Sequence, residues 1–314
     1  MLLPILLVLA SGMCHAVWSM FTKRSLNKSI FLWSIMMVST VLLLPVLLIE
    51  LWTQPLAAGA YALLLLSVAL QALYSWLLSI TYEMGDLSQI YPVMRGTSTL
   101  LIPLIGVIFL KESLSVYGWI GICCMLGGFA VLSGIGSRRS HPASSGSGSV
   151  SGTLASSGSM SVSGTPAASR PGTTLGYYTP MLMALCVGLC TTCYVFVDKL
   201  NLQHMSPLAL LEVTNIGFVA GLTPAVLRSR KLLEEWRRNT FTILLGSVLN
   251  PGSYLLFLFA LQQAPLAHIS PLREIGTIFA TLLGVLLLKE RQGVRRMICS
   301  VVIFCGILLI GIWG

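Results

Sequence analysis

The sequence has little charge. Asp, Glu, Lys and Arg make up only 9% of its 314 residues, whereas 55% are hydrophobic, and its mean hydropathy is +0.87. A soluble globular chain carries about 25% charged residues. This chain lacks the polar groups to cover its own surface in water, which excludes a soluble enzyme, a disordered chain and a nucleic-acid-binding protein. We therefore expect an integral membrane protein whose surroundings are the lipid bilayer.

Several chemical signatures are also missing. The sequence has no GxxxxGK[ST] nucleotide-binding loop, no HExxH and no GxSxG, so we expect neither ATP hydrolysis nor enzyme activity, and no catalytic residue. Its eight cysteines all lie in apolar runs, which argues against a disulfide framework. Cys186, Cys190 and Cys193 share one helical stripe without a His or carboxylate. We interpret that stripe as packing, and expect no metal and no cofactor.

Long apolar runs dominate what is present. A helix that crosses a bilayer needs about 20 apolar residues. Ten runs of about this length cover residues 1–21, 30–51, 59–81, 87–110, 114–134, 176–198, 206–227, 240–262, 267–288 and 294–313. The Ser- and Gly-rich stretch between the two sets of five cannot bury a core. We predict an all-α membrane protein with a five-helix repeat at 1–134, a flexible linker at 135–175 and a second five-helix repeat at 176–314.

An internal repeat relates the two sets. The segment GVIFLKES (106–113) matches GVLLLKER (284–291) 178 residues later, and Arg95 and Arg273 are separated by the same distance. The first helices match at a separation of 176, which pairs Gly12, Trp18 and Lys23 with Gly188, Tyr194 and Lys199. Because five is an odd number, the second repeat enters the membrane from the opposite side. Inverted repeats of this kind are typical of secondary transporters, whose sites form where the halves meet.

The basic residues predict the orientation. Fifteen Lys and Arg residues fall in loops on one side of the predicted membrane, two fall on the other, and Arg95 and Arg273 lie inside helices. The loops rich in Lys and Arg face the cytoplasm in most membrane proteins. We therefore expect the linker in the cytoplasm and both termini outside.

The two longest matching segments resemble a known family. YPVMRGTSTLLIPLIGVIFLKES (91–113) and SPLREIGTIFATLLGVLLLKER (270–291) are similar to the fourth helices of the drug/metabolite transporter superfamily, in its EamA-like branch. Pro92 and Pro271, with Glu112 and Glu290, stand where that family has a proline and a closing acid. The resemblance implies ten helices and transport, more often export, of a small metabolite.

The sequence departs from its relatives in two respects. Small multidrug-resistance relatives carry a membrane-embedded acid eight residues before a lysine, but the corresponding positions here are His15 and Thr191. This argues against proton-coupled export of cationic drugs by that mechanism. Many relatives are also expected to keep their termini inside the cell, opposite to the orientation that the basic residues predict.

The strongest site candidates are two arginines within predicted helices. An ionisable group inside a membrane costs several kcal/mol and is a functional candidate for that reason. We expect Arg95 and Arg273 to approach the midplane from opposite sides and to bind an anionic group, because guanidinium binds carboxylate or phosphate bidentately. The alternative for Arg273 is an ion pair with Glu212 at matching depth, since Glu274 points about 100° away. For Arg95, which has no carboxylate of matching depth, the alternative is snorkelling or bonding to backbone carbonyls.

Further candidates surround the arginines. His15 is expected either to carry a coupling proton or to hydrogen-bond across helices. Polar and aromatic residues recur at matching places in helices three and eight, and we expect them either to form a pocket wall or to pack helices. These are Gln71, Tyr74, Asn250 and Tyr254, with Trp18 and Tyr91 as weaker candidates.

The function that we expect is secondary transport by alternating access. The substrate is a small anionic or zwitterionic metabolite such as an amino acid, an organic acid or a phosphonate, and export is favoured over import. The alternative is a non-transporting membrane sensor or assembly partner. We expect a multi-pass protein of a bacterial inner membrane, with a homodimer left open.

Overall fold

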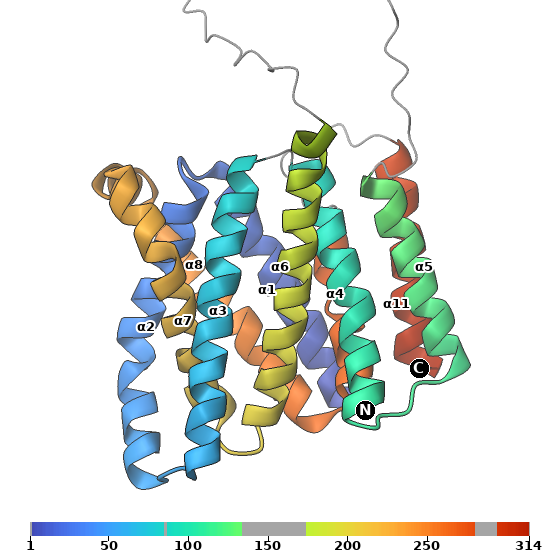
Figure 1. Ribbon diagram of the computed structural model, residues 1–314, viewed down its shortest axis with the longest axis horizontal. Helices are drawn as coiled ribbons and strands as arrows, with labels where there is room; N and C mark the ends of the chain where they lie inside the picture. The colour runs from blue at the N-terminus through green and yellow to red at the C-terminus, as the bar shows by residue number, and fades with distance from the viewer. Residues whose placement is uncertain (1, 85–86, 134–173, 280–293, 314) are drawn as a thin grey trace, which may run out of the picture.

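The computed structural model describes residues 2–84, 87–133, 174–279 and 294–313 (Figure 1). This part of the chain forms an all-helical membrane fold, as predicted, and seven of its helices are long and apolar enough to cross a membrane. The ten helices are α1 (Leu2–Arg24), α2 (Lys28–Thr53), α3 (Ala58–Met84), α4 (Leu87–Phe109), α5 (Val116–Ser133), α6 (Thr174–Asn201), α7 (Pro207–Ser229), α8 (Leu232–Gln263), α9 (Leu266–Leu272) and α11 (Val294–Trp313).

Local sequence signals explain where several helices begin. The side chain of Asn27 caps α2 by accepting the backbone N–H of Ile30, and Ser206 caps α7 in the same way at Ala209, with Pro207 at the first helical position. α8 begins earlier than the apolar run that predicted it, and its backbone is kinked at Asn239. Most of the predicted linker, residues 135–173, lies outside the described residues.

The helices pack as two halves related by a pseudo-two-fold axis. α1 packs on α8 as α6 packs on α3, α2 packs on α8 as α7 packs on α3, and α9 contacts α1 as α4 contacts α6. α2 packs against its own counterpart α7, and α5 against its counterpart α11. Figure 1 shows α1 and α6 running in opposite directions. These exchanged contacts follow from an inverted repeat, because each half must bury its apolar faces against the other.

The two ends of the bundle differ, and we name them by the chain segments found there. Leu2 and Trp313 lie at one end, the terminal end, and α5 ends and α6 begins at the opposite end, the linker end (Figure 1). α1, α3, α5 and α7 run toward the linker end, and α2, α4, α6, α8 and α11 run toward the terminal end. The orientation of these ends relative to the cytoplasm stays a prediction.

Small residues bring α5 and α11 into close contact. A Cβ atom added at Gly121 would lie 2.6 Å from the carbonyl oxygen of Gly306, and one added at Gly306 would lie 2.5 Å from that of Gly121. At Gly128 an added Cβ would meet the side chain of Ile303 at 2.6 Å. Only glycine permits this approach, in keeping with the role of small residues in membrane helix packing.

The predicted helix at 267–288 is not continuous, which corrects that expectation. α9 ends at Leu272, and Arg273 and Glu274 form a turn before helical structure resumes at residues 275–279. The backbone N–H of Glu274 bonds the carbonyl of Pro271, and that of Thr277 bonds the carbonyl of Glu274, so the bonds here span three residues instead of four. Pro271 cannot donate an N–H, which weakens the helix where the charged pair begins. Residues 280–288 lie outside the described part.

Candidate functional site

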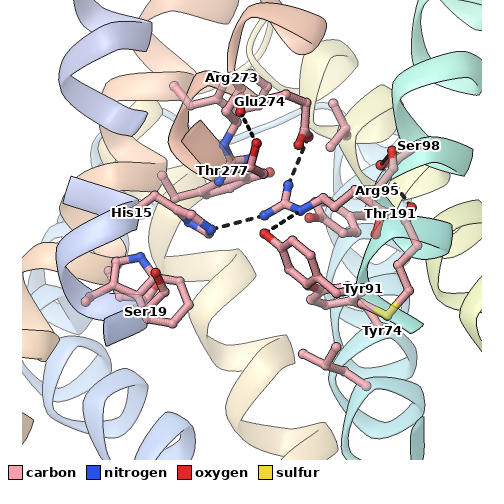
Figure 2. A pocket seen from close by; sticks show the side chains of 18 of the residues that line it. His15, Ser19, Tyr74, Tyr91, Arg95, Ser98, Thr191, Arg273, Glu274 and Thr277 are labelled. Carbon is pink, nitrogen blue, oxygen red and sulfur yellow. Dashed lines mark hydrogen bonds and ion pairs between the residues drawn. The ribbon is translucent and has the colours of Figure 1, made fainter. Parts of the chain in front are cut away.

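A cavity of about 390 Å³ lies between the two halves of the bundle. Its wall comes from both repeats and includes residues of α1, α3, α4, α6, α7, α8 and α9 (Figure 2). It reaches the linker end, because Thr22 near the end of α1, Lys28 at the start of α2 and Leu132 near the end of α5 line it. Toward the terminal end the described lining stops at Ile102, Val195 and Phe257. Among the described residues, the lining of the cavity therefore extends to the linker end and stops short of the terminal end.

The cavity brings together ten of the eleven residues that the sequence marked as site candidates. Glu212 is the exception, because it is fully buried in α7 and does not line the cavity. The ten are His15, Trp18, Gln71, Tyr74, Tyr91, Arg95, Asn250, Tyr254, Arg273 and Glu274.

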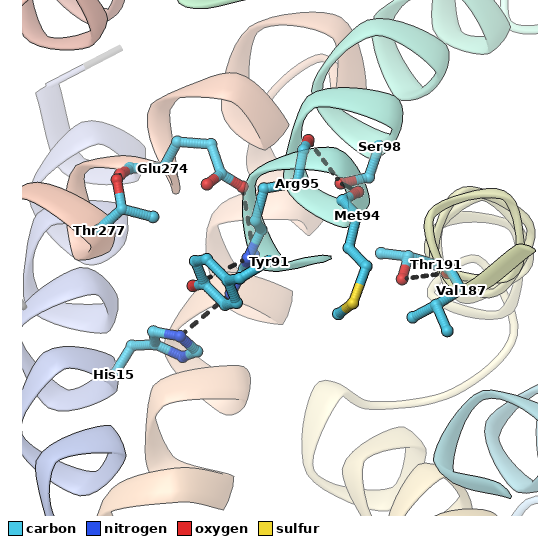
Figure 3. A network of polar contacts seen from close by, with 9 residues as sticks. All are labelled: His15, Tyr91, Met94, Arg95, Ser98, Val187, Thr191, Glu274 and Thr277. Atoms are coloured by element: carbon cyan, nitrogen blue, oxygen red, sulfur yellow. Dashed lines mark hydrogen bonds and ion pairs between the residues drawn. The ribbon is translucent and has the colours of Figure 1, made fainter. Parts of the chain in front are cut away.

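Arg95 is held by residues from α1, from its own helix α4 and from the turn after α9 (Figures 2 and 3). One guanidinium nitrogen donates to Glu274 Oε1 at 3.2 Å, a second contacts His15 Nε2 at 3.1 Å, and Nε donates to the Tyr91 hydroxyl at 3.1 Å. The side chains of Arg95 and Glu274 are only 21% and 6% exposed. The expectation that Arg95 lacks a carboxylate of matching depth, and would snorkel or bond carbonyls, is therefore wrong. The turn after α9 alters the helical spacing and carries Glu274 toward α4.

Arg273 lies in a different environment from its repeat counterpart. Its guanidinium carbon stands 5.0 Å from the centre of the Tyr254 ring and 4.4 Å from that of Phe257. Both distances are within cation–π range. The predicted pair between Arg273 and Glu212 is wrong: Glu212 instead accepts a hydrogen bond from Asn215 at 3.4 Å, and its Oε1 has no partner among the described residues. Arg273 has no hydrogen-bonded carboxylate in the described part of the chain, so its donors are available to a bound anion.

The contact with Arg95 fixes the tautomer of His15. A guanidinium has only donors, so Nε2 of His15 accepts, and the ring carries its proton on Nδ1. The ring also meets Trp18 edge-on, with centroids 4.9 Å apart. In this arrangement His15 acts as a neutral acceptor that helps to hold Arg95.

Aromatic and amide side chains complete the wall. Tyr74 and Tyr194 meet edge to face with centroids 5.1 Å apart, and Tyr194 lies 6.4 Å from Tyr254. Gln71 and Asn250, which match each other in the repeat, both line the cavity. Among cavity residues, the indole N–H of Trp18 and Oε2 of Glu274 are buried without a hydrogen-bond partner. The wall therefore combines apolar rings with polar groups that a polar solute satisfies better than an apolar one.

Polar contacts close the terminal end below the cavity. Glu112, after α4, accepts the backbone N–H groups of Leu266 and Ala267 at 2.8 and 2.7 Å and so caps α9. Lys199 donates to the carbonyls of Leu261 and Ala264 at 2.5 and 3.0 Å, which caps the end of α8. The predicted closing acid of the second repeat, Glu290, lies outside the described residues. Two charged residues thus cap the helices at the α8–α9 turn. Glu112 joins α4 of the first half to this turn, and Lys199 joins α6 of the second half to it.

The sequence reasoning missed one buried acid near the cavity. Asp198 of α6 is fully buried and accepts hydrogen bonds from Ser67 at 2.7 Å and from the Tyr254 hydroxyl at 2.5 Å. It was overlooked because it stands at the edge of an apolar run beside Lys199, where a charge pair suggests a helix end. Its alignment with Thr22 in the repeat was the available signal.

Comparisons with known proteins agree with this geometry. Residues 2–134 and 179–312 match the EamA-like transporter family. No curated protein matches the sequence. Among solved structures, the crystal structure of a protein with 12% sequence identity matches with a TM-score of 0.67, over 98% of this chain and 95% of its own. At that identity the match shows the fold alone. Because the family match extends over most of both halves, the chain belongs to the EamA-like transporter family.

Proposed function

We propose that this protein is a secondary transporter that moves a small anionic or zwitterionic metabolite out of the cell by alternating access. The observation that carries the proposal is the charged cavity between the two halves, whose described lining reaches the linker end and stops short of the terminal end. Membership of a transporter family supports the proposal that the protein binds a substrate and lies in a membrane. We infer the class of substrate and the direction of transport from the cavity and the distribution of charge.

The charges in the cavity favour an anion. In the middle of the cavity Arg95, Arg273 and Glu274 leave one net positive charge, and the ion pair between Arg95 and Glu274 leaves that charge on Arg273. Lys28 adds a further positive charge where the cavity reaches the linker end. Burying an unpaired cation is costly in a low-dielectric interior, so a carboxylate or phosphate that pairs with Arg273 is favoured. The rings of Tyr254 and Phe257 hold the guanidinium of Arg273 in place. Less side-chain entropy of Arg273 is therefore lost when the anion binds.

The repeat supports alternating access. The cavity opens at the linker end, while Glu112 and Lys199 close the terminal end through caps on the α8–α9 turn. In an inverted repeat the two halves exchange environments when they rock, so the opposite state closes the linker end and opens the terminal end. With the linker end in the cytoplasm, as the basic residues predict, the structure has the form of an exporter ready to load its substrate.

The test is solute counterflow in proteoliposomes. Purified protein is assayed with labelled pools of amino acids, dicarboxylates, phosphonates and cationic metabolites, alongside Arg273→Gln. A hydrogen-bonded contact to a charged group contributes about 1.5 to 3 kcal/mol, so we expect roughly a ten- to hundredfold loss of exchange of the anionic or zwitterionic pool. Arg228→Gln, the same change at an exposed position, is the matched control.

Three outcomes would contradict parts of the proposal. If the protein exchanges cations and Arg273→Gln does not change the rate of exchange, the protein is a transporter but its substrate site lies elsewhere. If Arg228→Gln lowers exchange as much as Arg273→Gln does, the loss of exchange is a general effect of removing a positive charge. Absence of exchange for every pool would favour the alternative, a non-transporting membrane sensor or assembly partner.

A further inference from the structure

Asp198 is a buried carboxyl at the boundary between the cavity and the closed terminal end. It lies in α6, and none of its surface is exposed. Ser67 of α3 donates to one of its oxygens at 2.7 Å and Tyr254 of α8 donates to the other at 2.5 Å. Three helices from both halves of the protein therefore meet at this carboxyl.

No cation balances the charge of Asp198 within the described residues. The lysine beside it, Lys199, points its ammonium to the carbonyls of Leu261 and Ala264 at the end of α8. The guanidinium carbon of Arg273 lies over the Tyr254 ring, 5.0 Å from its centre, and makes no ion pair with Asp198 among the described residues. A carboxylate in a membrane interior is expensive without a cation or a proton. Among the described residues, Asp198 is bonded by two hydroxyl groups and by no ammonium or guanidinium group. This environment accommodates the neutral carboxylic acid as well as the carboxylate.

Other titratable and charged groups stand on every element around Asp198. α4 carries no titratable residue between Arg95 and Phe109, and Glu112 follows its end. Those closest along the chain to Asp198 or to its partners are Cys190, Cys193, Tyr194 and Lys199 of α6, Tyr61 and Tyr74 of α3, and Arg273 after α9, with Tyr254 of α8 itself a partner. Tyr82 and Glu83 stand at the far end of α3, Tyr177, Tyr178 and Cys186 in the first half of α6, and Glu234, Glu235, Arg237 and Arg238 at the far end of α8.

The repeat relates this position to one with a different exposure. At the separation of 176 that aligns the first helices of the two halves, Asp198 corresponds to Thr22. Thr22 lines the cavity where it opens at the linker end. When the halves exchange environments, position 198 takes the place that position 22 has here and lines the pathway at the terminal end. The carboxyl is then exposed at the terminal end in that state, whereas in the present state it is buried and hydrogen-bonded to a residue that lines the cavity.

The hydroxyl of Tyr254 connects Asp198 to the cavity. Tyr254 lines the cavity with its ring and bonds Asp198 Oδ2 with its hydroxyl. A hydroxyl both accepts and donates, so a proton leaving the carboxyl passes to the Tyr254 oxygen as the hydroxyl proton passes to cavity water. His15 has no comparable role in this state, because its Nε2 is occupied as an acceptor by Arg95.

We propose that Asp198 is the proton-binding site of this transporter, and that it binds a proton in the state open at the terminal end and releases it to the cavity in the state open at the linker end. This proposal rests on the transport function proposed above. It assigns coupling to an acid in the second repeat, whereas the corresponding residue of the first repeat is Thr22.

The transport experiment imposes a pH gradient on proteoliposomes in sodium-free buffer. The probe is the labelled pool of amino acids, dicarboxylates and phosphonates, with protein-free liposomes as the blank. For one-for-one coupling, a gradient of about one pH unit supports up to roughly a tenfold solute gradient. We expect wild type to accumulate solute in the acidic lumen, because protons that leave the lumen down their gradient are exchanged for solute that enters. Asp198→Asn should lose that accumulation, while Ser67→Ala, which keeps the carboxyl, should retain it at a lower rate.

The outcomes separate the two proposals. If wild type shows no counterflow of any pool, the transport function fails and the coupling proposal fails with it. If wild type shows counterflow but no response to the pH gradient, or responds to a sodium gradient instead, transport stands and the proton site is wrong. Accumulation by Asp198→Asn at the wild-type level also overturns the proton site. A monodisperse size-exclusion profile in detergent establishes that each variant is folded.

A second measurement needs no substrate. Infrared difference spectra of the reconstituted protein, recorded between about pH 5 and about pH 9, detect the C=O stretch of protonated carboxyl groups. The difference between wild type and Asp198→Asn isolates the contribution of this residue from those of Glu212 and Glu274. We expect a band that disappears as the pH rises and that is missing from the variant. A spectrum unchanged by the substitution would overturn the assignment even if the variant transports poorly.

Discussion

The ion pair between Arg95 and Glu274 allows a quantitative prediction. The two side chains are 21% and 6% exposed, and their nearest nitrogen and oxygen atoms are 3.2 Å apart. Removing one member of a buried pair costs about 3 to 5 kcal/mol, because the other charge stays buried without compensation. In Glu274→Gln the remaining charge is Arg95, which keeps its contacts to His15 and Tyr91. We therefore expect the lower end of that range, about 3 kcal/mol, or roughly a hundredfold in the folding equilibrium.

A double-mutant cycle separates the pair from the effects of each substitution. We expect Arg95→Gln and Glu274→Gln each to be destabilising, and the double variant to be less destabilised than the sum by about 2 kcal/mol, because it leaves no unpaired charge. The assay is equilibrium unfolding in mixed micelles with a rising fraction of SDS, followed by circular dichroism. Glu234→Gln, the same change at an exposed position, is the control. It should change the free energy of unfolding by less than about 0.5 kcal/mol.

Two results would refute this reasoning. A coupling energy near zero would show that the pair does not contribute as a unit. A double variant less stable than the sum of the single variants would show that each glutamine disturbs the cavity by itself.

Two further predictions concern packing and capping. Gly121→Leu should lower the thermal midpoint in detergent by an amount that corresponds to about 1 to 3 kcal/mol, because a Cβ there would lie 2.6 Å from the carbonyl oxygen of Gly306; Gly127→Leu, with no neighbour within 4 Å of an added Cβ, should be nearly neutral. Glu112→Ala should cost about 1 to 2 kcal/mol by removing the cap of α9. Hydrogen exchange should then accelerate in the first turn of α9, and unchanged protection there would contradict the capping role.

Most of the fold could be predicted because the bilayer imposes strong constraints on sequence. Span lengths follow from the thickness of the hydrocarbon, and the inverted arrangement follows from a five-helix repeat. The close contact of α5 and α11 depends on glycines that are present in both apolar runs. The break at Arg273 and Glu274 was missed, because hydropathy records that a segment is apolar but not whether its hydrogen bonds are continuous.

The membership of the site could be predicted better than its pairings. Depth along a helix placed Arg95 and Arg273 near the middle of the membrane, and polar residues repeated in helices three and eight identified part of the wall. Pairing depends on rotation about each helix axis, and one irregular turn changes it. Depth along the helices predicted no carboxylate near Arg95, but the turn at Glu274 places one there. Glu212 instead contacts Asn215 in the interior.

The two arginines show how a symmetric fold acquires an asymmetric site. Arg95 and Arg273 occupy equivalent positions 178 residues apart, but the residue that follows Arg273 is Glu274 and the residue that follows Arg95 is Gly96. Gly96 has no side chain to supply a second carboxylate, and an added Cβ there would approach Phe129 within 3.3 Å. Within the described residues, Glu274 is the acid that pairs with one of the two arginines, and it pairs with the arginine of the opposite half. That pair joins α4 to the turn after α9 and so links the two halves that move in the proposed alternating access, while Arg273 is the arginine that we propose pairs with an anion. In the proposed exchange of environments, Arg273 meets Gly96 where Arg95 here meets Glu274, so we expect the two states to differ in energy although the two halves share one repeat.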